Sequence, residues 1–426
     1  IWQIKIDGED HRPLYSELGD SYSPRWSPNQ DRLAFLSNNS ESTQIHMYWF
    51  KSGETRAITQ LPESPSSLSW SPDGKWIAFT MNVKTKSNAI VESREKPDGA
   101  NWAKKPITVT TTRYQYDGRG IVEPSYRHIF VVPAEGGSAR QLTTGNFNHY
   151  GSLSWSPDSE SIFFSAHRSD DWELASSEAD IHRVKITDES IDQITNQSGE
   201  ESSPIVSPNG KLVAFNLRER RPLAYTPNRI AVMDLEGKNM RVISGDLDGD
   251  AENIVWAEDS QSIYFTYDER GIRKIGEITL TGKLSEAATS IGGTTIGRPY
   301  VSGGFHVAKN IIAFTYGQSD RPADLAIMQN GKFKLLTGLN EDLLAHRKLG
   351  EVNEIIYKSS FDGQEIQGWY ITPPDYDPTK KYPLILEIHG GPHLAYGPHF
   401  SAELQIMAAA GYIVFYDNYR GSESYG

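Results

Sequence analysis

The chain has 426 residues, which is enough for two or more domains. Its formal net charge of −13 argues against a nucleic-acid partner, and the lack of any cysteine excludes disulfides and thiolate metal sites. No apolar run reaches the ~18 residues that a membrane span needs, so we expect no membrane partner.

The chain opens with what its pattern predicts to be half of a four-stranded unit. Residues 1–6 and 12–15 are expected to form a third and a fourth strand, joined by a turn at residues 7–9. The two strands that should precede them are missing, and the chain has no initiator Met. We therefore expect that residue 1 is not the native start of the protein.

A short phrase then recurs, each time followed by an apolar strand. It reads Trp-Ser-Pro-Asn at 26–29, Trp-Ser-Pro-Asp-Gly at 70–74, Trp-Ser-Pro-Asp at 155–158, Val-Ser-Pro-Asn-Gly at 206–210 and Trp-Ala-Glu-Asp at 256–259. The following strands carry a phenylalanine in register, and the steps between these residues are 44, 85, 51, 50 and 49: Phe35, Phe79, Phe164, Phe215, Phe265 and Phe314. Self-similarity at this period predicts an array of similar sheet units.

Each repeat is predicted to hold four antiparallel strands in ~40–50 residues, which is typical of a β-propeller blade. Full blades are expected near residues 23–60, 67–145, 151–196, 203–246, 253–285 and 300–338. With the half unit in front, the prediction is a seven-bladed propeller over residues 1–343 whose first blade is incomplete. An ordinary β-sandwich is the alternative, but a sandwich gives no reason for the repeated phrase.

The blade that contains the 85-residue step carries an insertion between Thr80 and Ile129. This insertion is basic within an acidic chain: Lys84, Lys86, Arg94, Lys96, Lys104, Lys105, Arg113, Arg119 and Arg127. Insertions in repeat proteins gather on one face, which is often the binding face. The positive insertion is expected either to meet a carboxylate of a substrate or of a neighbouring subunit, or to be a solvated loop.

Three acidic segments are weaker candidates. Residues 246–250 alternate acids as a calcium loop does, but Ala257 stands where an EF-hand needs Glu, and an acidic loop between blades is the preferred interpretation. Glu200-Glu201 and residues 170–173 are candidates for holding the amino terminus of a substrate, with a solvated blade edge as the preferred alternative. The histidines of the propeller region lack metal-ligand spacing, so no metal and no cofactor are expected.

After residue 343 the pattern changes to that of an open α/β sheet. Strands are expected at 354–359, 366–371, 382–388 and 412–416, with a helix at 401–410. The apolar run at 382–388 is expected to be buried on both faces. The strand at 412–416 is expected to be an exposed edge, and this stretch to be disordered, poorly packed or completed by a second polypeptide.

The chemistry is predicted to lie in the loop that follows residue 388, which reads His389-Gly390-Gly391-Pro392-His393. A glycine-rich loop at the carboxyl end of a buried strand can direct backbone N–H groups outward. Acyl transfer needs such donors where the tetrahedral intermediate develops negative charge, and one donor is worth about 3–4 kcal/mol of barrier. In α/β-hydrolases an HGG-type loop supplies one of them.

These residues together resemble the prolyl oligopeptidase family of serine peptidases, in its acylaminoacyl-peptidase and dipeptidyl-peptidase-like branch. The resemblance is carried by the propeller phrases, Asp362-Gly363 with Gly368-Trp369, the 389–393 loop and Asn418-Tyr419-Arg420-Gly421-Ser422. It implies an oxyanion hole at Gly391 and Gly390. It also implies that His389, Pro392, His393, Tyr419 and Arg420 shape the site. Ser424 departs from the pattern, since glycine is expected there.

The nucleophile elbow of that family, Gly-x-Ser-x-Gly, does not occur in the 426 residues. We therefore expect the catalytic Ser, Asp and His to lie beyond residue 426. Residues 344–426 would then be the N-terminal portion of the hydrolase domain, and the 426 residues alone would be inactive.

The predicted function is that of a serine peptidase which hydrolyses short or N-acylated peptides, with the propeller gating access. The alternative is a non-catalytic TolB-like binding propeller with a vestigial hydrolase tail. A peptide substrate is the expected partner, and a homo-oligomer is compatible with the sequence. The compartment stays open between the cytoplasm, which we favour, and the periplasm.

Overall fold

The computed structural model describes residues 1–16, 19–38, 42–85, 94–103, 107–109, 111–175, 178–221, 225–391 and 393–426. The chain divides into two compact units, of which one comprises Ile1 and Leu14–Pro204 and the other Trp2–Pro13 and Ile205–Gly426. This division does not test the predicted boundary between a propeller and a hydrolase domain at residue 343, which stays a prediction.

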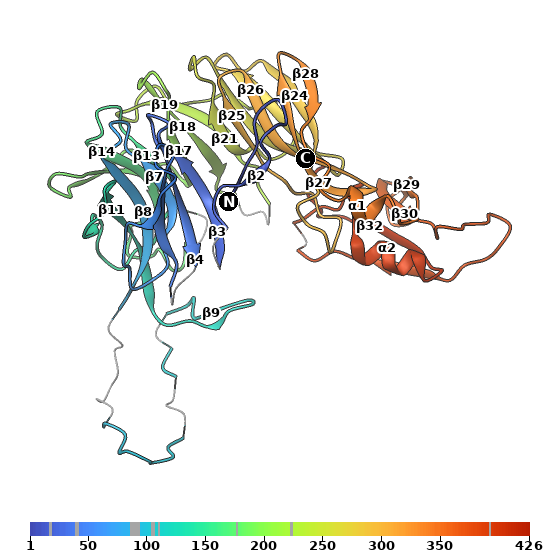
Figure 1. Cartoon of the computed structure of the whole chain (residues 1–426), viewed down its shortest axis with the longest axis horizontal. Helices are drawn as coiled ribbons and strands as arrows, with labels where there is room; N and C mark the ends of the chain where they lie inside the picture. The colour runs from blue at the N-terminus through green and yellow to red at the C-terminus, as the bar shows by residue number, and fades with distance from the viewer. Residues whose placement is uncertain are drawn as a thin grey trace. The chain divides into compact units, whose positions relative to one another are not determined.

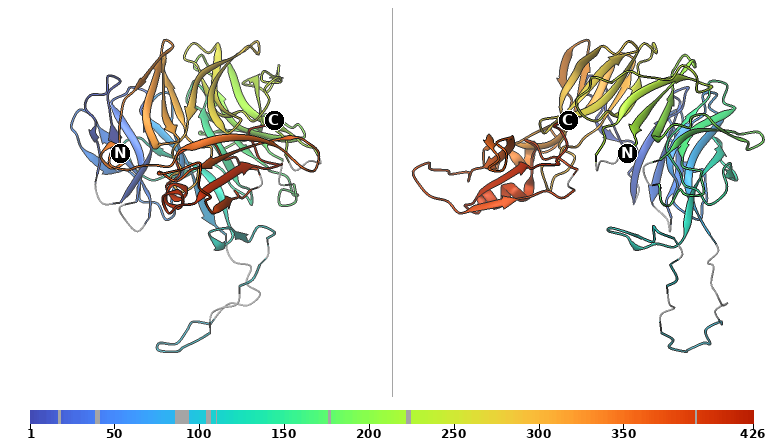
Figure 2. Two further views of the ribbon diagram at one scale, coloured as in Figure 1. Left: turned by 90° about the vertical axis from the view of Figure 1, so that its right-hand side faces the viewer. Right: turned by 180° about the vertical axis from the view of Figure 1, so that it is seen from behind.

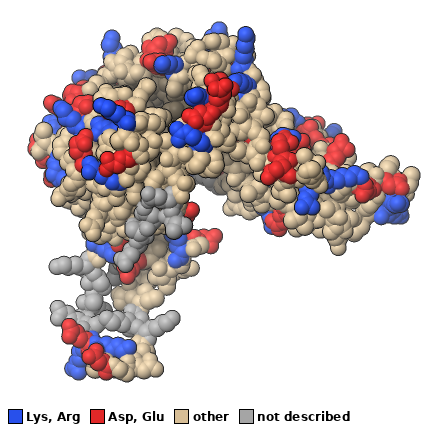
Figure 3. Space-filling view, in the orientation of Figure 1, with Lys and Arg blue, Asp and Glu red and all other residues tan. Residues whose placement is uncertain are grey.

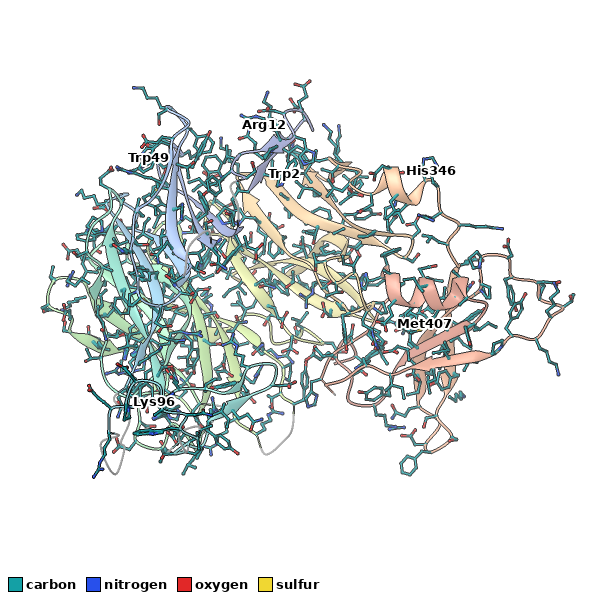
Figure 4. All side chains as sticks on the ribbon, turned by 60° about the horizontal axis from the view of Figure 1, so that its bottom comes forward. Trp2, Arg12, Trp49, Lys96, His346 and Met407 are labelled. Carbon is teal, nitrogen blue, oxygen red and sulfur yellow. The ribbon has the colours of Figure 1, made fainter. Side chains whose placement is uncertain are left out.

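The chain begins with a hairpin of two short strands, β1 (Trp2–Gln3) and β2 (Arg12–Pro13). Figure 4 labels Trp2 and Arg12 on these neighbouring strands. The turn of the hairpin contacts the last blade, because Lys334 Nζ donates a hydrogen bond to the Asp7 carbonyl at 2.6 Å. The predicted half unit is therefore present, with strands shorter than the sequence suggested.

Three four-stranded antiparallel sheets follow, each made of strands that succeed one another in sequence except where the insertion interrupts the second sheet (Figure 1). They are β3 (Asp20–Trp26), β4 (Arg32–Asn38), β5 (Gln44–Trp49) and β6 (Thr55–Ala57); then β7 (Ser66–Trp70), β8 (Trp76–Lys84), β11 (Ser125–Pro133) and β12 (Arg140–Gln141); then β13 (His149–Trp155), β14 (Ser161–Ala166), β15 (Asp180–Lys185) and β16 (Ile191–Gln193). The insertion lies between β8 and β11 and contains a small hairpin, β9 (Gln115–Tyr116) and β10 (Gly120–Ile121).

The remaining blades follow in the same manner. One sheet holds β17 (Gly199–Val206), β18 (Leu212–Glu219), β19 (Arg229–Asp234) and β20 (Arg241–Val242). The last two blades share an eight-stranded sheet, because Ile291 pairs with Tyr316: β21 (Glu252–Trp256), β22 (Ser262–Glu269), β23 (Ile272–Thr279), β24 (Leu284–Ile291), β25 (Phe305–Ala308), β26 (Ile311–Gln318), β27 (Arg321–Gln329) and β28 (Lys332–Leu335). The six in-register phenylalanines are all buried, each at 2% exposure or less.

The repeated phrase has two structural roles. Its serine closes the turn, since Ser71 Oγ donates to Asp73 at 2.6 Å and accepts from the Trp76 amide at 2.9 Å. Its tryptophan reaches back to the preceding copy: Trp70 Nε1 donates to the Arg25 carbonyl and Trp155 Nε1 to the Ser69 carbonyl. In the second unit Trp256 Nε1 donates to the Ile205 carbonyl at 2.9 Å. The phrase therefore recurs because it joins consecutive blades.

The first strand of several blades contains a bulge with a left-handed residue three positions before the phrase. Ser23, Ser67, Ser203 and Asn253 have φ of 54°, 55°, 55° and 51°. The pairing register shifts across three of these positions, in β3, β7 and β21. A bulge strengthens the local twist of a strand, and no sequence pattern had indicated this one.

A short helix, α1 (Glu341–Leu344), leads to a sheet of different type. The sheet holds β29 (Val352–Lys358), β30 (Glu365–Ile371), β31 (Leu384–Glu387) and β32 (Ile413–Asn418) in the order β29-β30-β32-β31, with β31 and β32 parallel. Helix α2 (Ala402–Ala409) covers one face (Figure 2). Ser401 Oγ caps this helix by accepting from the Leu404 amide.

Two expectations about this sheet are wrong. The strand at 413–418 is not an edge, because β32 pairs with both β30 and β31, and its Val414 and Tyr416 are fully buried. The edge is β31, and it is not covered on both faces, since Leu384 and Leu386 are 61% and 52% exposed. Helix α2 covers only one face, and within the described residues nothing covers these two side chains on the other.

Charged side chains of both signs are interspersed on the face drawn in Figure 3. Among the described residues, no helix has both the length and the apolar character needed to cross a bilayer.

Candidate oxyanion site

The predicted loop leaves the end of β31 and is held in place by a buried histidine. His389 is 3% exposed, and its ring stacks on Tyr419 with the two centroids 4.5 Å apart. Its Nε2 lies 2.9 Å from Ser422 Oγ, and its Nδ1 lies 2.8 Å from the Gly390 carbonyl. The Tyr419 hydroxyl donates to the His389 carbonyl at 2.8 Å. The segment after β32 therefore fixes the start of the loop.

Both glycines of the loop are exposed. Within the described residues, neither the Gly390 nor the Gly391 amide donates a hydrogen bond to another group of the chain. Gly391 has φ of +133°, and a Cβ there would lie 2.7 Å from the His393 nitrogen. Only glycine suits such a backbone conformation, and the conformation leaves both N–H groups available to an acceptor outside the chain.

A second layer of polar contacts supports this loop. Asn418, at the end of β32, accepts from the Tyr396 amide and donates to the Tyr396 carbonyl, both at 2.8 Å. Tyr396 is fully buried, and its hydroxyl donates to Glu387 Oε1 at 3.0 Å. These contacts join the two ends of the loop to the two parallel strands, so the loop is preorganised before any ligand arrives.

An ion-pair network ties the loop region to the connection between β24 and β25. Arg298 forms a two-pronged contact with Glu403 on α2, at 2.9 and 3.2 Å, and also pairs with Glu387 on β31. Paired guanidinium–carboxylate contacts of this kind fix geometry as well as charge. Sequence reasoning missed Arg298, Glu387 and Tyr396, because no local pattern sets them apart from other surface or core residues.

The remaining predicted site residues that the structure describes, Arg420 and His393, have partners other than His389. The Arg420 side chain pairs with Asp362 in the β29–β30 turn, and this hydrogen bond raises the pKa of Arg420. His393 stacks on Tyr225, with the centroids 5.6 Å apart. Pro392 lies outside the described residues. The site thus brings together His389, both glycines and Tyr419, whereas Arg420 turns to the neighbouring hairpin.

Beside His393 lies a cluster of acidic side chains around Tyr225. The cleft there is lined by Tyr225, Asp250, Glu252, Tyr267, Asp268, Glu423 and Ser424. Arg273 neutralises part of this charge, with contacts of 2.8 Å to Asp268 and 3.0 Å to Glu252. Burial, together with the carboxylates of Asp250 and Glu252, raises the pKa of Glu423 to about 7.

Two residues in this region, Ser424 and Asp250, were singled out in the sequence, and both accept hydrogen bonds from the backbone. Ser424, where glycine was expected, accepts from the Gly271 amide through its hydroxyl at 2.8 Å, which a glycine could not do. Asp250, the last acid of the calcium-like segment, accepts from the Asn228 amide and from the Tyr225 hydroxyl.

The other polar candidates are in the first unit. Glu201 on β17 is fully buried, and burial raises its pKa to about 7. Glu173 accepts hydrogen bonds from the amide and hydroxyl of Thr112 in the insertion, both at 3.1 Å. Burial lowers the pKa of His128 and His182 to about 4 and that of His149 to about 3, so all three are neutral near pH 7.

Successive four-stranded blades followed in sequence by a mixed sheet with an amide-presenting loop are the elements of a propeller and of hydrolase-type α/β structure. A family model described as the TolB beta propeller domain matches residues 2–221. The chain belongs to this family.

Comparison with curated proteins and with solved structures supports the same class. The chain is 28% identical to peptidase YuxL of Bacillus subtilis, over 95% of this chain and 62% of that protein. It is 25% identical to dipeptidyl-peptidase 5 of Porphyromonas gingivalis, over 100% of this chain and 63% of that protein. The acylaminoacyl peptidase of Pyrococcus horikoshii superposes with a TM-score of 0.75 at 22% identity, over 96% of this chain and 59% of that one.

A puromycin-hydrolyzing peptidase of Mycobacterium tuberculosis has the same fold, with a TM-score of 0.66 at 15% identity over 96% of this chain and 60% of that one. The predicted likeness to the prolyl oligopeptidase family, and the predicted fold of propeller plus hydrolase sheet, are confirmed by these matches. The chain spans about three fifths of the length of the relatives.

Proposed function

We propose that this chain forms the propeller and the oxyanion-loop part of a serine peptidase that hydrolyses short or N-acylated peptides. The proposal gives the Gly391 amide, with the neighbouring Gly390 amide, the task of stabilising the oxyanion of the tetrahedral intermediate. It gives His389 and Tyr419 a positioning task, because their contacts hold the start of the loop.

One observation carries the proposal: two adjacent exposed amides lack an acceptor within the described residues, on a loop whose base is buried and hydrogen-bonded. Preorganised N–H donors stabilise a developing negative charge without reorganising, and this is usually a large contribution to catalysis of acyl transfer. In a loop without this function, the two amides could instead donate hydrogen bonds to the neighbouring sheet.

The substrate class rests on likeness. A related acylaminoacyl peptidase has been solved in complex with Z-Gly-Gly-Phe-chloromethyl ketone, which is a blocked short peptide carrying a reactive group. Relatives named dipeptidyl-peptidase act on peptides by name. Both support a peptide substrate for this chain over the alternative of a propeller that only binds.

The test is labelling with a fluorophosphonate, which reacts with activated serines. The protein expressed from its complete gene should be labelled, and substitution of the serine in its Gly-x-Ser-x-Gly elbow should abolish the label. The 426-residue chain, which lacks this motif, is the matched control and should stay unlabelled. An unlabelled complete protein that still binds peptides would contradict the proposal and favour the binding propeller.

A further inference from the structure

The first unit contains a cavity of about 570 Å³ at the base of the basic insertion. It lies where β8 ends and β11 begins, beside the hairpin of β9 and β10, of which Figure 1 labels β9. Its walls come from the connection between β6 and β7, from the insertion, from β8 and β11, from the start of β13 and the residue before it, and from the segment after β14. This volume is that of a small-molecule or peptide-end site.

The walls are fixed to the blades by specific contacts. Glu173 accepts two hydrogen bonds from Thr112, which ties the insertion to the segment after β14 just before the β9–β10 hairpin. The ring of Tyr126 meets that of Trp172 edge to face, with centroids 5.8 Å apart. The Arg127 amide donates to Asn148 Oδ1 at 2.9 Å. The cavity therefore exists before any ligand binds.

The lining carries four cationic side chains and two carboxylates, in a chain whose overall charge is negative. Both carboxylates pair with the same lysine, since Lys84 Nζ lies 3.0 Å from Glu63 and 3.4 Å from Glu123. Within the described residues, the guanidinium groups of Arg113, Arg119 and Arg127 form no ion pair. The cavity thus keeps a surplus of positive charge on side chains that recognise carboxylates with two parallel hydrogen bonds.

The other walls are aromatic. Tyr116, Tyr126, Tyr150 and Trp172 line the cavity beside the arginines. Burial, with the nearby carboxylate of Glu200, raises the pKa of Tyr150 to about 12. Its phenol therefore stays protonated near pH 7 and adds a hydrogen-bond donor rather than a negative charge. Guanidinium groups next to aromatic faces suit a ligand that carries both a carboxylate and an apolar side chain.

We propose that this cavity binds the C-terminal end of a short peptide, with the free carboxylate on the arginines and the last side chain against the tyrosines and Trp172. This deepens the proposed function, on which it rests for the choice of a peptide as the ligand. A free carboxylate occurs only at the end of a chain, so such a site selects peptides by their end and disfavours internal segments of long chains.

The test is direct binding to the 426-residue chain, measured by isothermal titration calorimetry. The probes are N-acetyl-Ala-Phe with a free carboxylate and the same dipeptide as its C-terminal amide. Because hydrogen bonds to charged groups contribute more than neutral ones, we expect the carboxylate form to bind about tenfold more tightly. The preference should weaken as salt rises, since two of the arginines are exposed.

Variants locate the site. Arg113→Gln and Arg119→Gln should each reduce the preference for the carboxylate form, and the double variant should abolish it. Arg94→Gln is the matched control, because Arg94 is an exposed arginine of the same insertion that does not line the cavity. Circular dichroism melting of each variant separates lost binding from lost folding, and Arg113→Lys, which keeps the charge but loses the fork, should retain part of the preference.

Equal affinity for the two dipeptides would overturn the proposal, and so would inorganic phosphate that competes as well as the peptide does. A change in sedimentation on Arg113→Gln without any peptide preference would also overturn it, by assigning the cavity to a second copy of the chain. These outcomes leave the fluorophosphonate test untouched, so failure of this site and failure of the peptidase proposal can be told apart.

Discussion

Gly391 has a backbone conformation that a side chain would disturb, and this makes it the sharpest test of the oxyanion loop. Gly391→Ala adds a Cβ that meets the His393 nitrogen at 2.7 Å. The loop must shift, and misplacing one oxyanion donor costs about 10²-fold in kcat. We expect that loss in the complete enzyme, measured by peptide hydrolysis under saturating substrate.

Gly331→Ala is the matched control for that variant. Gly331 has φ of +70° in the β27–β28 turn, and a Cβ there meets nothing within 4 Å. Alanine at φ +70° is less strained than alanine at φ +133°, but it also takes a positive φ, and kcat should stay unchanged. An equal loss of kcat in both variants would mean that strain, rather than a displaced amide, explains the effect.

Glu201 gives a pH prediction, because its carboxyl is fully buried and has a pKa near 7 in place of about 4.5. The folded state therefore holds a proton that the unfolded state has already lost. Stability from this group is present below about pH 4.5 and is lost as pH rises through 7. Glu201→Gln should remove this loss, and it should stabilise the chain by about 1–3 kcal/mol at pH 8 relative to pH 4.5.

Urea unfolding of wild type and Glu201→Gln at pH 4.5, 6 and 8 measures this difference. The difference between the two proteins should grow with pH, whatever the other carboxyls contribute to both. Parallel pH profiles would show that the buried carboxyl titrates alike in the folded and unfolded states.

At the scale of residues, sequence reasoning could propose only the part of the candidate site that is contiguous in sequence. His389, Gly390 and Tyr419 belong to short phrases whose chemistry can be read locally. Arg298 could not be found in this way, because its structural role depends on its ion pair with Glu403, which is 105 positions away in sequence. Arg420 stands in a recognised phrase, yet its partner Asp362 comes from a hairpin whose approach only the folded sheet determines.

At the scale of elements, the link between consecutive blades can be tested at β13. Trp155→Phe removes the indole donor to the Ser69 carbonyl, at 3.2 Å, from a side chain that is 5% exposed. A lost buried hydrogen bond and a smaller ring together cost about 1–3 kcal/mol. We expect the first unfolding transition of Trp155→Phe to have a lower urea midpoint than that of the wild type. Far-ultraviolet circular dichroism measures this midpoint without relying on tryptophan fluorescence.

Trp26→Phe is the corresponding change in the first copy of the phrase, where the ring is 56% exposed. Substitutions at such exposed positions usually change stability by less than about 0.5 kcal/mol. If Trp26→Phe destabilised the chain as much as Trp155→Phe, the indole link would not be the cause.

The elements show why some predictions failed. The apolar run at 382–388 resembles a doubly covered strand, but β31 is an edge strand paired with β32, and within the described residues Leu384 and Leu386 stay exposed. The strand at 413–418 follows β31 in sequence but lies between β30 and β31 in space. Strand order is a long-range property, and hydrophobic pattern alone does not contain it.

At the scale of the whole molecule, the insertion should be separable from the blade that carries it. Lys96 is exposed in the β8–β11 connection, and Figure 4 labels it. Strands β8 and β11 pair over nine positions without help from residues 94–103. Brief trypsin treatment should therefore cut after Arg94, because Pro97 protects the bond after Lys96, and leave two fragments that co-elute on gel filtration.

Mass spectrometry of the co-eluting fragments identifies the cut. An Arg94→Gln chain should resist cleavage at this bond and serves as the control. Separation of the fragments after cutting would mean that the connection itself holds β8 against β11.

The propeller was predictable because its period is written in short, local units that repeat. One turn phrase and one buried phenylalanine per blade are enough to reveal the array. The bulges at Ser23, Ser67 and Asn253 were not predictable, because a serine or asparagine in a strand sequence does not by itself indicate a positive φ.

The indole links have a consequence for how the propeller comes apart. Each joins a blade only to its predecessor, so opening one blade should loosen its immediate neighbour and leave those further away closed. Backbone amides should then exchange with deuterium in blocks that correspond to adjacent blades, and the sequence of those blocks would reveal where the array begins to melt.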